Sequence, residues 1–467
     1  MRRYLIGVIM LALVATGGIA TATRTGTPDV ARFITDEHGR ALILHGFNTA
    51  SSAKSTPDAH PDFTEADLDR ERRDIGTNFV RYLIQWRAVE PEPGVYDDDY
   101  LREVSERVQW YAQRGYHVML DMHQDLYGGH ITPEGDAGNG APHWATIMDG
   151  LPVEAQDQWE LYYLEPGVIR AFDNFWNTTG RHPELMEHYA DAWGHVARFF
   201  ADDPAVIGYD LMNEPWGGTL QGAAFETGPL AKLYQSTIDR IRRHDSDSWI
   251  FVEPQAVGIN WGLPSSLPRL DDPRGGDARI GYAPHLYPLP LDLGGGYDSD
   301  GDLIDTTMDW WLDNVLRTAQ RLDAPILLGE FGYDATLPGT LDYIEAATRL
   351  SDENLMGWAY WSRDNGGWGP YTDDGDAQPL VSVLDRAYPR AIAGTPTRID
   401  YQPDRLTVSF IGSPDITAPT EIYLPREFGA RPSVNCGACD TEWDGQRRIL
   451  SVTTPPTEIE QHIVVSG

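Results

Sequence analysis

Two glutamates directly follow short apolar runs of the chain, where a charged side chain is unexpected. Glu214 comes after "VIGYDLMN", and Glu330 comes after "PILLG". Such runs are typical of buried strands, so an acid at the end of one requires a partner or a task. Two facing carboxylic acids can hydrolyse an acetal, because one protonates the departing oxygen while the other attacks the acetal carbon or activates water. We therefore predict that Glu214 and Glu330 form a catalytic pair.

Other polar and aromatic residues also stand at the ends of apolar runs. They are Arg81, His123, Asp125, Asn213, His285, Tyr287 and Trp361. One glutamate in such a place is more often a salt-bridged residue than a catalyst, but two glutamates with these neighbours favour catalysis. A tryptophan ring can stack on the apolar face of a sugar, and charged side chains can orient its hydroxyl groups. The set as a whole indicates a site that binds and cleaves a glycoside.

Eight apolar runs of strand length recur along most of the chain. They cover residues 41–47, 78–84, 117–123, 206–212, 249–254, 280–287, 325–331 and 356–362. Helical patterns separate most of them, as in residues 100–114 and 183–200. Buried strands that alternate with amphipathic helices indicate a parallel sheet, and eight repeats favour a closed barrel. We predict an α/β fold, a (β/α)8 TIM barrel over residues 30–394, whose strand ends bring the polar residues to one rim.

The pattern changes after Gly394 and Pro396. Runs such as "RLTVSFIG" and "RILSVTT" alternate with a period of two residues and show no helical pattern. This alternation predicts a C-terminal antiparallel β-sandwich domain over residues 395–467. The domain lacks a clustered aromatic platform for sugar, which favours a domain that buttresses the barrel over one that binds sugar or membrane.

The first residues have the order of a secretory signal. Arg2 and Arg3 precede an apolar run, and a stretch of small residues ends at Ala22. We predict a signal peptide over residues 1–22 and a secreted protein. The alternative is an uncleaved membrane anchor, which the Gly-rich end of the run disfavours.

Cys436 and Cys439 are the two cysteines of the sequence and form a C-x-x-C pair. Such a pair can be a redox centre or half of a zinc site, but no second pair or nearby histidine completes a zinc site. For an exported protein, we favour a local disulfide. The acidic stretch "DSDGD" at residues 298–302 lacks a full calcium-loop pattern and is more typical of a solvated turn. We predict neither a metal nor a cofactor.

The composition is strongly acidic. The chain has 36 Lys and Arg residues against 71 Asp and Glu residues, which gives a formal net charge of −35. Such a surface repels phosphate backbones and anionic headgroups, which argues against nucleic-acid binding. A neutral or zwitterionic partner fits better, and we expect the protein to be a monomer.

The order of these motifs resembles that of a retaining glycoside hydrolase of family 5. The match covers residues 36 to about 390 and rests on "NEP" after the fourth run, "GEFG" in the seventh, and the Arg, His, His-x-Tyr and Trp positions. Within the family, "DMHQD", "APHWATIMDGLP", "FDNFW" and the two-domain layout are similar to the endoglycoceramidases, which release intact oligosaccharides from glycosphingolipids. The resemblance implies double displacement by two glutamates whose carboxyl groups lie about 5 to 5.5 Å apart.

The resemblance also implies a role for each matched residue. Glu214 would be the acid/base. Glu330 would be the nucleophile, held ionised by Arg81 and hydrogen-bonded by Tyr287. Asn213 would bind the sugar 2-hydroxyl, where an interaction can strengthen in the transition state.

The remaining matches concern the sugar. His123 and His285 would orient sugar and carboxylates, and Trp361 would form the floor of the −1 subsite. Additional sugar-binding positions of the subfamily match Lys54, Asp125 and Trp159. The alternatives are a solvated loop lysine at position 54 and a packing role for the tryptophan at position 159.

Three hypotheses follow for the function. The first is a secreted endoglycosylceramidase, for which residues 127–177, a long insertion, and residues 285–297 would supply a wall or an apolar groove beside the carboxylates. Exposed apolar residues on such loops would allow transient contact with a membrane or micelle. The second is a family 5 β-glycanase that acts on soluble glycans such as β-glucan or mannan. The third is a non-catalytic carbohydrate-binding protein.

Overall fold

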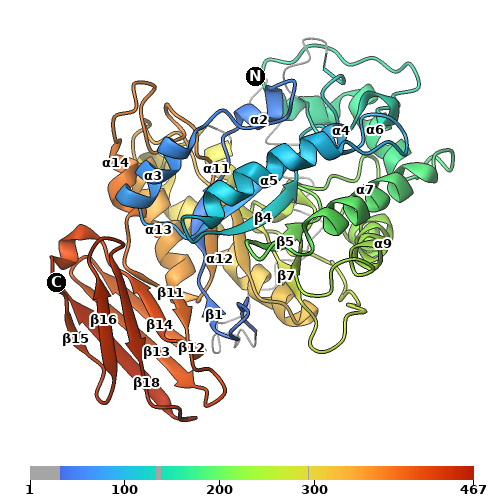
Figure 1. Ribbon diagram of the computed structural model, residues 1–467. Helices are drawn as coiled ribbons and strands as arrows, with labels where there is room; N and C mark the ends of the chain where they lie inside the picture. Colours follow the sequence, from blue (N-terminus) through green and yellow to red (C-terminus); the bar gives the residue numbers. More distant parts are fainter. Residues whose placement is uncertain (1–31, 133–137, 293) are drawn as a thin grey trace.

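The computed structural model describes residues 32–132, 138–292 and 294–467, so the predicted signal peptide, residues 1–22, lies outside the described part. Figure 1 shows strands enclosed by helices, with an all-β unit beside them at the C-terminus. The inner strands are β2 (His45–Asn48), β3 (Phe79–Ile84), β4 (His117–Met122), β5 (Val206–Asp210), β6 (Trp249–Val252), β7 (Ile280–Tyr282), β8 (His285–Leu286), β9 (Leu327–Phe331) and β10 (Gly357–Tyr360).

The inner strands close into a barrel in which one strand is interrupted, so that β7 and β8 are its two halves. β7 pairs with β6, and β8 pairs with β9, while Ala283 and Pro284 separate the two halves. A parallel bridge between Tyr282 and Ile326 adds a contact from β7 toward β9. The pairs within this sheet are parallel throughout the described residues. When β7 and β8 are counted as one strand, each of the eight predicted runs supplies one strand, and the predicted (β/α)8 barrel is confirmed.

Helices cover the outside of the barrel (Figure 1). Helices α5 (Asp98–Ala112) and α7 (Glu184–Phe200) are two that the helical spacing predicts, and their apolar residues face inward. The others are α2 (Ser52–Ser55), α3 (Glu65–Asp74), α4 (Trp86–Val89), α6 (Pro166–Phe175), α8 (Ala223–Phe225), η3 (Glu226–Leu230), α9 (Ala231–Ile241), α10 (Ala256–Ile259), α11 (Leu289–Asp292), α12 (Tyr297–Leu322), α13 (Thr340–Glu353) and α14 (Pro379–Leu384). Within the described residues, no helix has the length and apolar character needed to span a bilayer.

The acidic stretch at residues 298–302 differs from its prediction. We expected a solvated turn, but these residues belong to the start of α12, which is kinked at Asp300, where φ is −124° and ψ is 16°. Acidic side chains are favourable at a helix N-terminus because they oppose the partial positive charge of the unpaired amide groups. The local charge pattern therefore suits a helix start as well as a turn.

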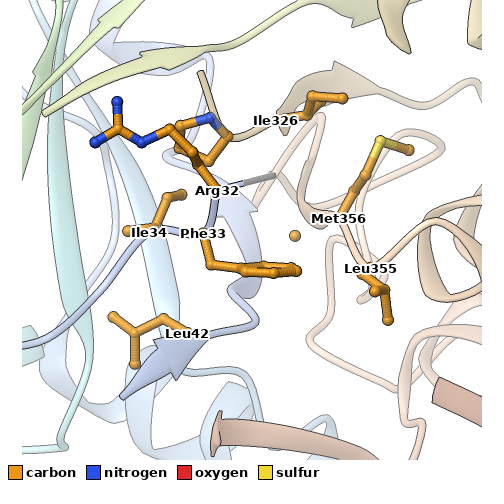
Figure 2. A pocket seen from close by; sticks show the side chains of 9 residues that line it. Arg32, Phe33, Ile34, Leu42, Ile326, Leu355 and Met356 are labelled. Atoms are coloured by element: carbon orange, nitrogen blue, oxygen red, sulfur yellow. The ribbon is translucent and has the colours of Figure 1, made fainter. Parts of the chain in front are cut away.

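The floor of the barrel is apolar. The N-terminal ends of the strands lie next to a small pocket, which Figure 2 shows from close by. Its lining combines the charged Arg32 with the apolar residues Phe33, Ile34, Leu42, Ile326, Leu355 and Met356. The catalytic candidates stand at the opposite, C-terminal ends of the strands, which is where the chemistry of such barrels is found.

The C-terminal unit consists of two antiparallel sheets, as the alternating pattern predicts. The first sheet has the order β1 (Ala41–Leu42), β11 (Tyr388–Ile392), β14 (Thr420–Tyr423), β17 (Ile449–Thr453) and β16 (Asp440–Asp444). The second has the order β12 (Gly394–Gln402), β13 (Arg405–Gly412), β18 (Glu460–Ser466) and β15 (Ser433–Asn435), and η4 (Arg426–Phe428) is a short turn of helix in this unit. Cys436 and Cys439 form a disulfide in the connection between β15 and β16, which belong to different sheets.

The sandwich takes in residues from before position 395. Strand β11 belongs to it, and so does β1, whose Ala41 pairs with Ile392. The apolar run 41–47 is thus divided between the two units, because β2 continues into the barrel. A run of apolar residues looks the same in the sequence whether it belongs to the barrel or to the sandwich. Only the long-range pairing of β1 with β11 assigns residues 41 and 42 to the sandwich.

The described residues of the insertion, 127–132 and 138–177, pack over one side of the barrel rim. It contains η1 (His143–Ala145), η2 (Trp159–Leu164) and α6. An isolated bridge joins Asn139 to Asp125 beside the end of β4. The ring of Phe172 in α6 lies 5.2 Å from that of Trp216, which follows β5. The insertion therefore forms a wall beside the ends of β4 and β5.

Candidate active site

The two candidate glutamates face each other at the C-terminal rim of the barrel. Glu330 lies within β9, and Glu214 follows β5 after three further residues. One carboxylate oxygen of each glutamate and one ring nitrogen of His285 lie within 4.8 Å of one another. The two strands are not neighbours in the sheet. The barrel therefore brings two acids from distant parts of the chain to within the reach of one glycosidic bond.

Glu330 is held by two donors. The Arg81 Nη1 group donates to Oε1 of Glu330 at 2.7 Å, and the Tyr287 hydroxyl donates to Oε2 at 3.0 Å. Burial raises the pKa of Glu330, and the opposing charges of His285 and Arg81 reduce this effect without cancelling it. The contacts that the resemblance implies for Arg81 and Tyr287 are present, and they fix both oxygens of the carboxylate.

Glu214 is held through one of its two carboxylate oxygens. Its Oε1 accepts a hydrogen bond from Asn260 Nδ2 at 2.8 Å and lies 2.9 Å from His285 Nδ1. Burial lowers the pKa of His285, but the charges of Glu253 and Glu330 and hydrogen bonds to Glu214 and Glu253 raise it well above its ordinary value. Within the part of the chain that the structure describes, these hydrogen bonds go to Oε1, which leaves Oε2 of Glu214 for contact with a substrate.

Arg81 is shared among four carboxylates. Its guanidinium is fully buried and lies 3.0 Å from Asp121, 2.8 Å from Asp210, 2.8 Å from Glu253 and 2.7 Å from Glu330. Burial and the charge of Glu253 raise the pKa of Asp210 well above its ordinary value in spite of Arg81. One guanidinium thus cannot fully offset so many carboxylates, and its effect on Glu330 is diluted.

Metal ligation is the other chemistry open to these groups. Glu214, His285 and Glu330 are of ligand types that bind a divalent cation. Their atoms already take part in hydrogen bonds with Asn260 and Tyr287, which suits carboxylates that act directly on a substrate. The buried trio Asp121, Asp210 and Glu253 offers three carboxylates that could also bind a cation, but the Arg81 guanidinium contacts all three.

A second cluster adjoins the glutamates. The rings of His123 and Trp361 stack at 5.4 Å, and Lys54 Nζ lies 4.3 Å from the centre of the tryptophan ring. Lys54 Nζ also lies 2.9 Å from Asp125 Oδ2. Burial would raise the pKa of Asp125, but the charge of Lys54 and a hydrogen bond from His123 hold it far below its ordinary value. An aromatic floor beside an ion pair is suited to a polyhydroxylated ring.

Asn213 and Trp159 differ in how closely they join the site. Asn213 is buried, and its Oδ1 accepts from Arg81 Nη2 at 2.9 Å. Trp159, by contrast, is 44% exposed on η2, and its ring lies 6.1 Å from Tyr163. Among the described residues, the hydrogen-bonded site thus includes Asn213, whereas Trp159 lies outside it on the insertion.

Sequence reasoning missed several members of the site. They are Asn48, Asp121, Asn139, Asp210, Glu253 and Asn260. A signal for Glu253 is present, because "VEP" at the end of β6 repeats the strand, glutamate and proline order of "NEP". Asn260 lies at the end of a short helix and carries no such signal.

Comparisons with known proteins identify the family of both domains. Residues 35–367 match the cellulases of glycosyl hydrolase family 5, and residues 386–465 match the family 5 C-terminal domain. Endoglycoceramidase I of Rhodococcus hoagii is 30% identical over 404 residues, which cover 84% of this chain and 78% of that protein. The structure of endo-glycoceramidase II from Rhodococcus sp. is 57% identical with a TM-score of 0.89, over 93% of this chain and 99% of that chain.

A further structure of that Rhodococcus enzyme is a complex with the ganglioside GM3. It is 58% identical to this chain with a TM-score of 0.91, over 93% of this chain and 99% of that chain. The similarity extends through both domains, since the two family matches together span the barrel and the sandwich. The resemblance that the sequence motifs indicate is confirmed.

Proposed function

The chain belongs to glycoside hydrolase family 5, with endoglycoceramidases among its relatives, and on that premise we propose that it cleaves the β-glycosidic bond between oligosaccharide and ceramide in glycosphingolipids. The observation that carries this proposal is the position of Glu214 and Glu330. One carboxylate oxygen of Glu214 lies within 4.8 Å of one carboxylate oxygen of Glu330. The choice of substrate is supported by the similarity to an enzyme studied in complex with a ganglioside.

The mechanism we propose is double displacement. In the first step, Glu330 attacks the anomeric carbon, the bond to the ceramide oxygen breaks, and Glu214 gives its proton to that oxygen. In the second step, Glu214 takes a proton from water, whose oxygen attacks the same carbon and breaks the bond to Glu330. One oxygen of each carboxylate lies within 4.8 Å of the other. This close approach supports double displacement over inversion, in which the two carboxyl groups stand about 6.5 to 9.5 Å apart to admit a water molecule.

Neighbouring residues complete the proposed mechanism. Arg81 and Tyr287 keep Glu330 oriented for attack, and both contacts are short enough for hydrogen bonds. Asn213 would meet the sugar 2-hydroxyl, His123 would orient the sugar, and the Trp361 ring would form its floor. No metal or cofactor takes part in these steps.

The lipid end of the substrate requires apolar surface near the rim. The insertion exposes Leu151, Trp159 and Leu164, of which Leu164 is 60% exposed. We propose that these side chains make transient contact with a micelle or membrane, since apolar residues contribute to such binding without basic charge. We also propose that the protein is exported and acts as a monomer, as its N-terminal sequence and acidic composition favour.

The test compares substrates of different classes. Purified protein is incubated with a detergent-solubilised glycosphingolipid, with cello-oligosaccharides and with manno-oligosaccharides, and products are identified by mass spectrometry. We expect an intact oligosaccharide and ceramide from the lipid. Cleavage of the soluble oligosaccharides with none of the lipid would instead identify a β-glycanase.

Variants separate catalysis from binding alone. Because Glu330 is the proposed nucleophile, E330A is expected to lose on the order of 10⁴-fold or more in kcat. E106A is the matched control, since Glu106 is an exposed glutamate on α5, and it is expected to keep full activity. Unchanged function in E330A would support a non-catalytic carbohydrate-binding protein.

A further inference from the structure

A third glutamate, Glu253, lies behind the two proposed catalytic glutamates. It directly follows β6, and its side chain is 2% exposed. It lies between Arg81, which holds the proposed nucleophile Glu330, and Glu214, the proposed acid/base. Its Oε1 accepts from Arg81 Nη2 at 2.8 Å, and its Oε2 accepts from the backbone N–H of Glu214 at 2.8 Å. No step of the proposed reaction uses this carboxylate.

The backbone of Glu214 needs this hydrogen bond more than most residues do. Glu214 has a φ of 43°, in the left-handed region that side chains other than glycine rarely adopt. Such a strained conformation persists only where neighbouring groups enforce it. The Oε2 atom of Glu253 accepts the N–H of this strained residue, and it therefore helps to set the direction in which the Glu214 side chain points.

Glu253 reaches Glu214 by a second route, through His285. The Nε2 atom of His285 lies 3.3 Å from Oε1 of Glu253, while its Nδ1 atom lies 2.9 Å from Oε1 of Glu214. The imidazole thus lies between the two carboxylates. His285 is 1% exposed, and its contact with Glu253 is a charge contact between buried groups rather than a well-aligned hydrogen bond.

We propose that Glu253 is a positioning residue for the general acid, which holds the backbone of Glu214 directly and its carboxyl group through His285. Glu253 acts on proton donation to the leaving group, whereas Arg81 and Tyr287 act on nucleophilic attack. This inference rests on the proposed function in one respect, the assignment of Glu214 as the acid. It does not depend on ceramide being the leaving group.

Leaving groups of different quality provide the test. A good leaving group such as 2,4-dinitrophenolate departs without a proton, whereas phenolate requires protonation in the transition state. Wild type and E253Q are therefore compared on a series of aryl β-glycosides from 2,4-dinitrophenyl to phenyl, with kcat/KM as the readout of the first chemical step. Glutamine keeps the shape of Glu253, but its amide nitrogen must face either the N–H of Glu214 or the donors of Arg81 and His285, so one contact is lost.

The expected result is a loss that grows as the leaving group worsens. E253Q should lose less than about 5-fold on the dinitrophenyl glycoside and about 10- to 100-fold on the phenyl glycoside, within the 10²- to 10⁴-fold that general acid catalysis supplies. D210N is the matched control, because Asp210 is a buried partner of the same Arg81 guanidinium at 2.8 Å. D210N should change all members of the series by one common factor.

An equal loss for E253Q on every aryl glycoside would overturn the proposal, since it would place Glu253 with the nucleophile or the fold alone. If E253Q does not fold, E253D is measured on the same aryl glycosides; it keeps the charge but is shorter by one methylene group. A loss that grows as the leaving group worsens supports the proposal, and an equal loss overturns it. The thermal unfolding midpoint is measured for each variant. A separate outcome would show that the proposed lipid substrate is wrong. In that case the wild-type protein hydrolyses the aryl glycosides but releases no oligosaccharide from a glycosphingolipid.

Discussion

At the scale of single residues, the site separates groups that hold the nucleophile from groups that hold the acid. Tyr287 and Arg81 contact Glu330, whereas Asn260 donates to Glu214. His285 lies near both carboxylates, 2.9 Å from Glu214 and 3.6 Å from Glu330. Substitutions in the two sets should therefore have different kinetic signatures, which is the basis of the leaving-group test.

The two tryptophans assigned to sugar binding should differ in importance. Trp361 stacks on His123 beside the catalytic pair, whereas Trp159 is exposed on the insertion. We expect W361A to lower kcat/KM on an aryl β-glycoside by on the order of 10²-fold, equivalent to about 3 kcal/mol. W159A should change it by less than about 3-fold. A loss in W159A as large as that in W361A would place η2 in direct contact with the sugar.

Although Arg81 lies in the middle of β3 rather than at its end, the sequence allowed the prediction of those site residues that lie in or directly after an apolar run and carry a recognisable motif. Glu214, Glu330, Arg81 and His285 belong to this group, because the ends of parallel strands converge on one rim. Asp121 and Asp210 were missed although they lie in apolar strands, since an acid within a strand has no evident partner until the barrel closes around Arg81. Residues on irregular loops cannot be placed by periodicity at all.

At the scale of elements, the strands were predictable and their allocation to sheets was not. Apolar runs identify strands because strands in this barrel are buried on both faces. The division of residues 41–47 between β1 and β2 depends instead on pairing with β11, more than 340 positions away along the chain, as the Ala41 to Ile392 register shows. The break between β7 and β8 likewise leaves no mark in the sequence beyond Pro284.

At the scale of the whole molecule, the sandwich is closely joined to the barrel. Tyr388 of β11 stacks on His45 of β2 with ring centres 3.8 Å apart, and its hydroxyl donates to the carbonyl oxygen of Gly76. Arg386 contacts Asp352 of α13 at 2.6 Å. These buried contacts support the expectation that the C-terminal domain buttresses the barrel.

Asp385 makes this junction sensitive to pH. Burial raises the pKa of Asp385 to about 6, against the charge of Arg448 and a hydrogen bond from Tyr423. The unfolded value is about 3.9, so the folded protein binds the proton more tightly, and this group's stabilising contribution is present at low pH and is lost as pH rises through about 6. D385N should therefore gain stability relative to wild type, by on the order of 1 kcal/mol, between pH 5 and pH 8.

Urea unfolding of wild type and D385N at both pH values measures this difference. The variant removes the titrating group and keeps an acceptor for the Tyr423 hydroxyl. A difference in unfolding free energy that stays constant between pH 5 and pH 8 would show that Asp385 titrates normally.

The stereochemistry of the first product tests the proposed double displacement most directly. Hydrolysis of a β-glycoside is followed by proton NMR from the moment of mixing, before the released sugar mutarotates. Attack by Glu330 followed by water predicts that the β-anomer forms first, because two inversions restore the starting configuration. The α-anomer as first product would mean that water attacks the substrate directly, and Glu330 would then be a base rather than a nucleophile.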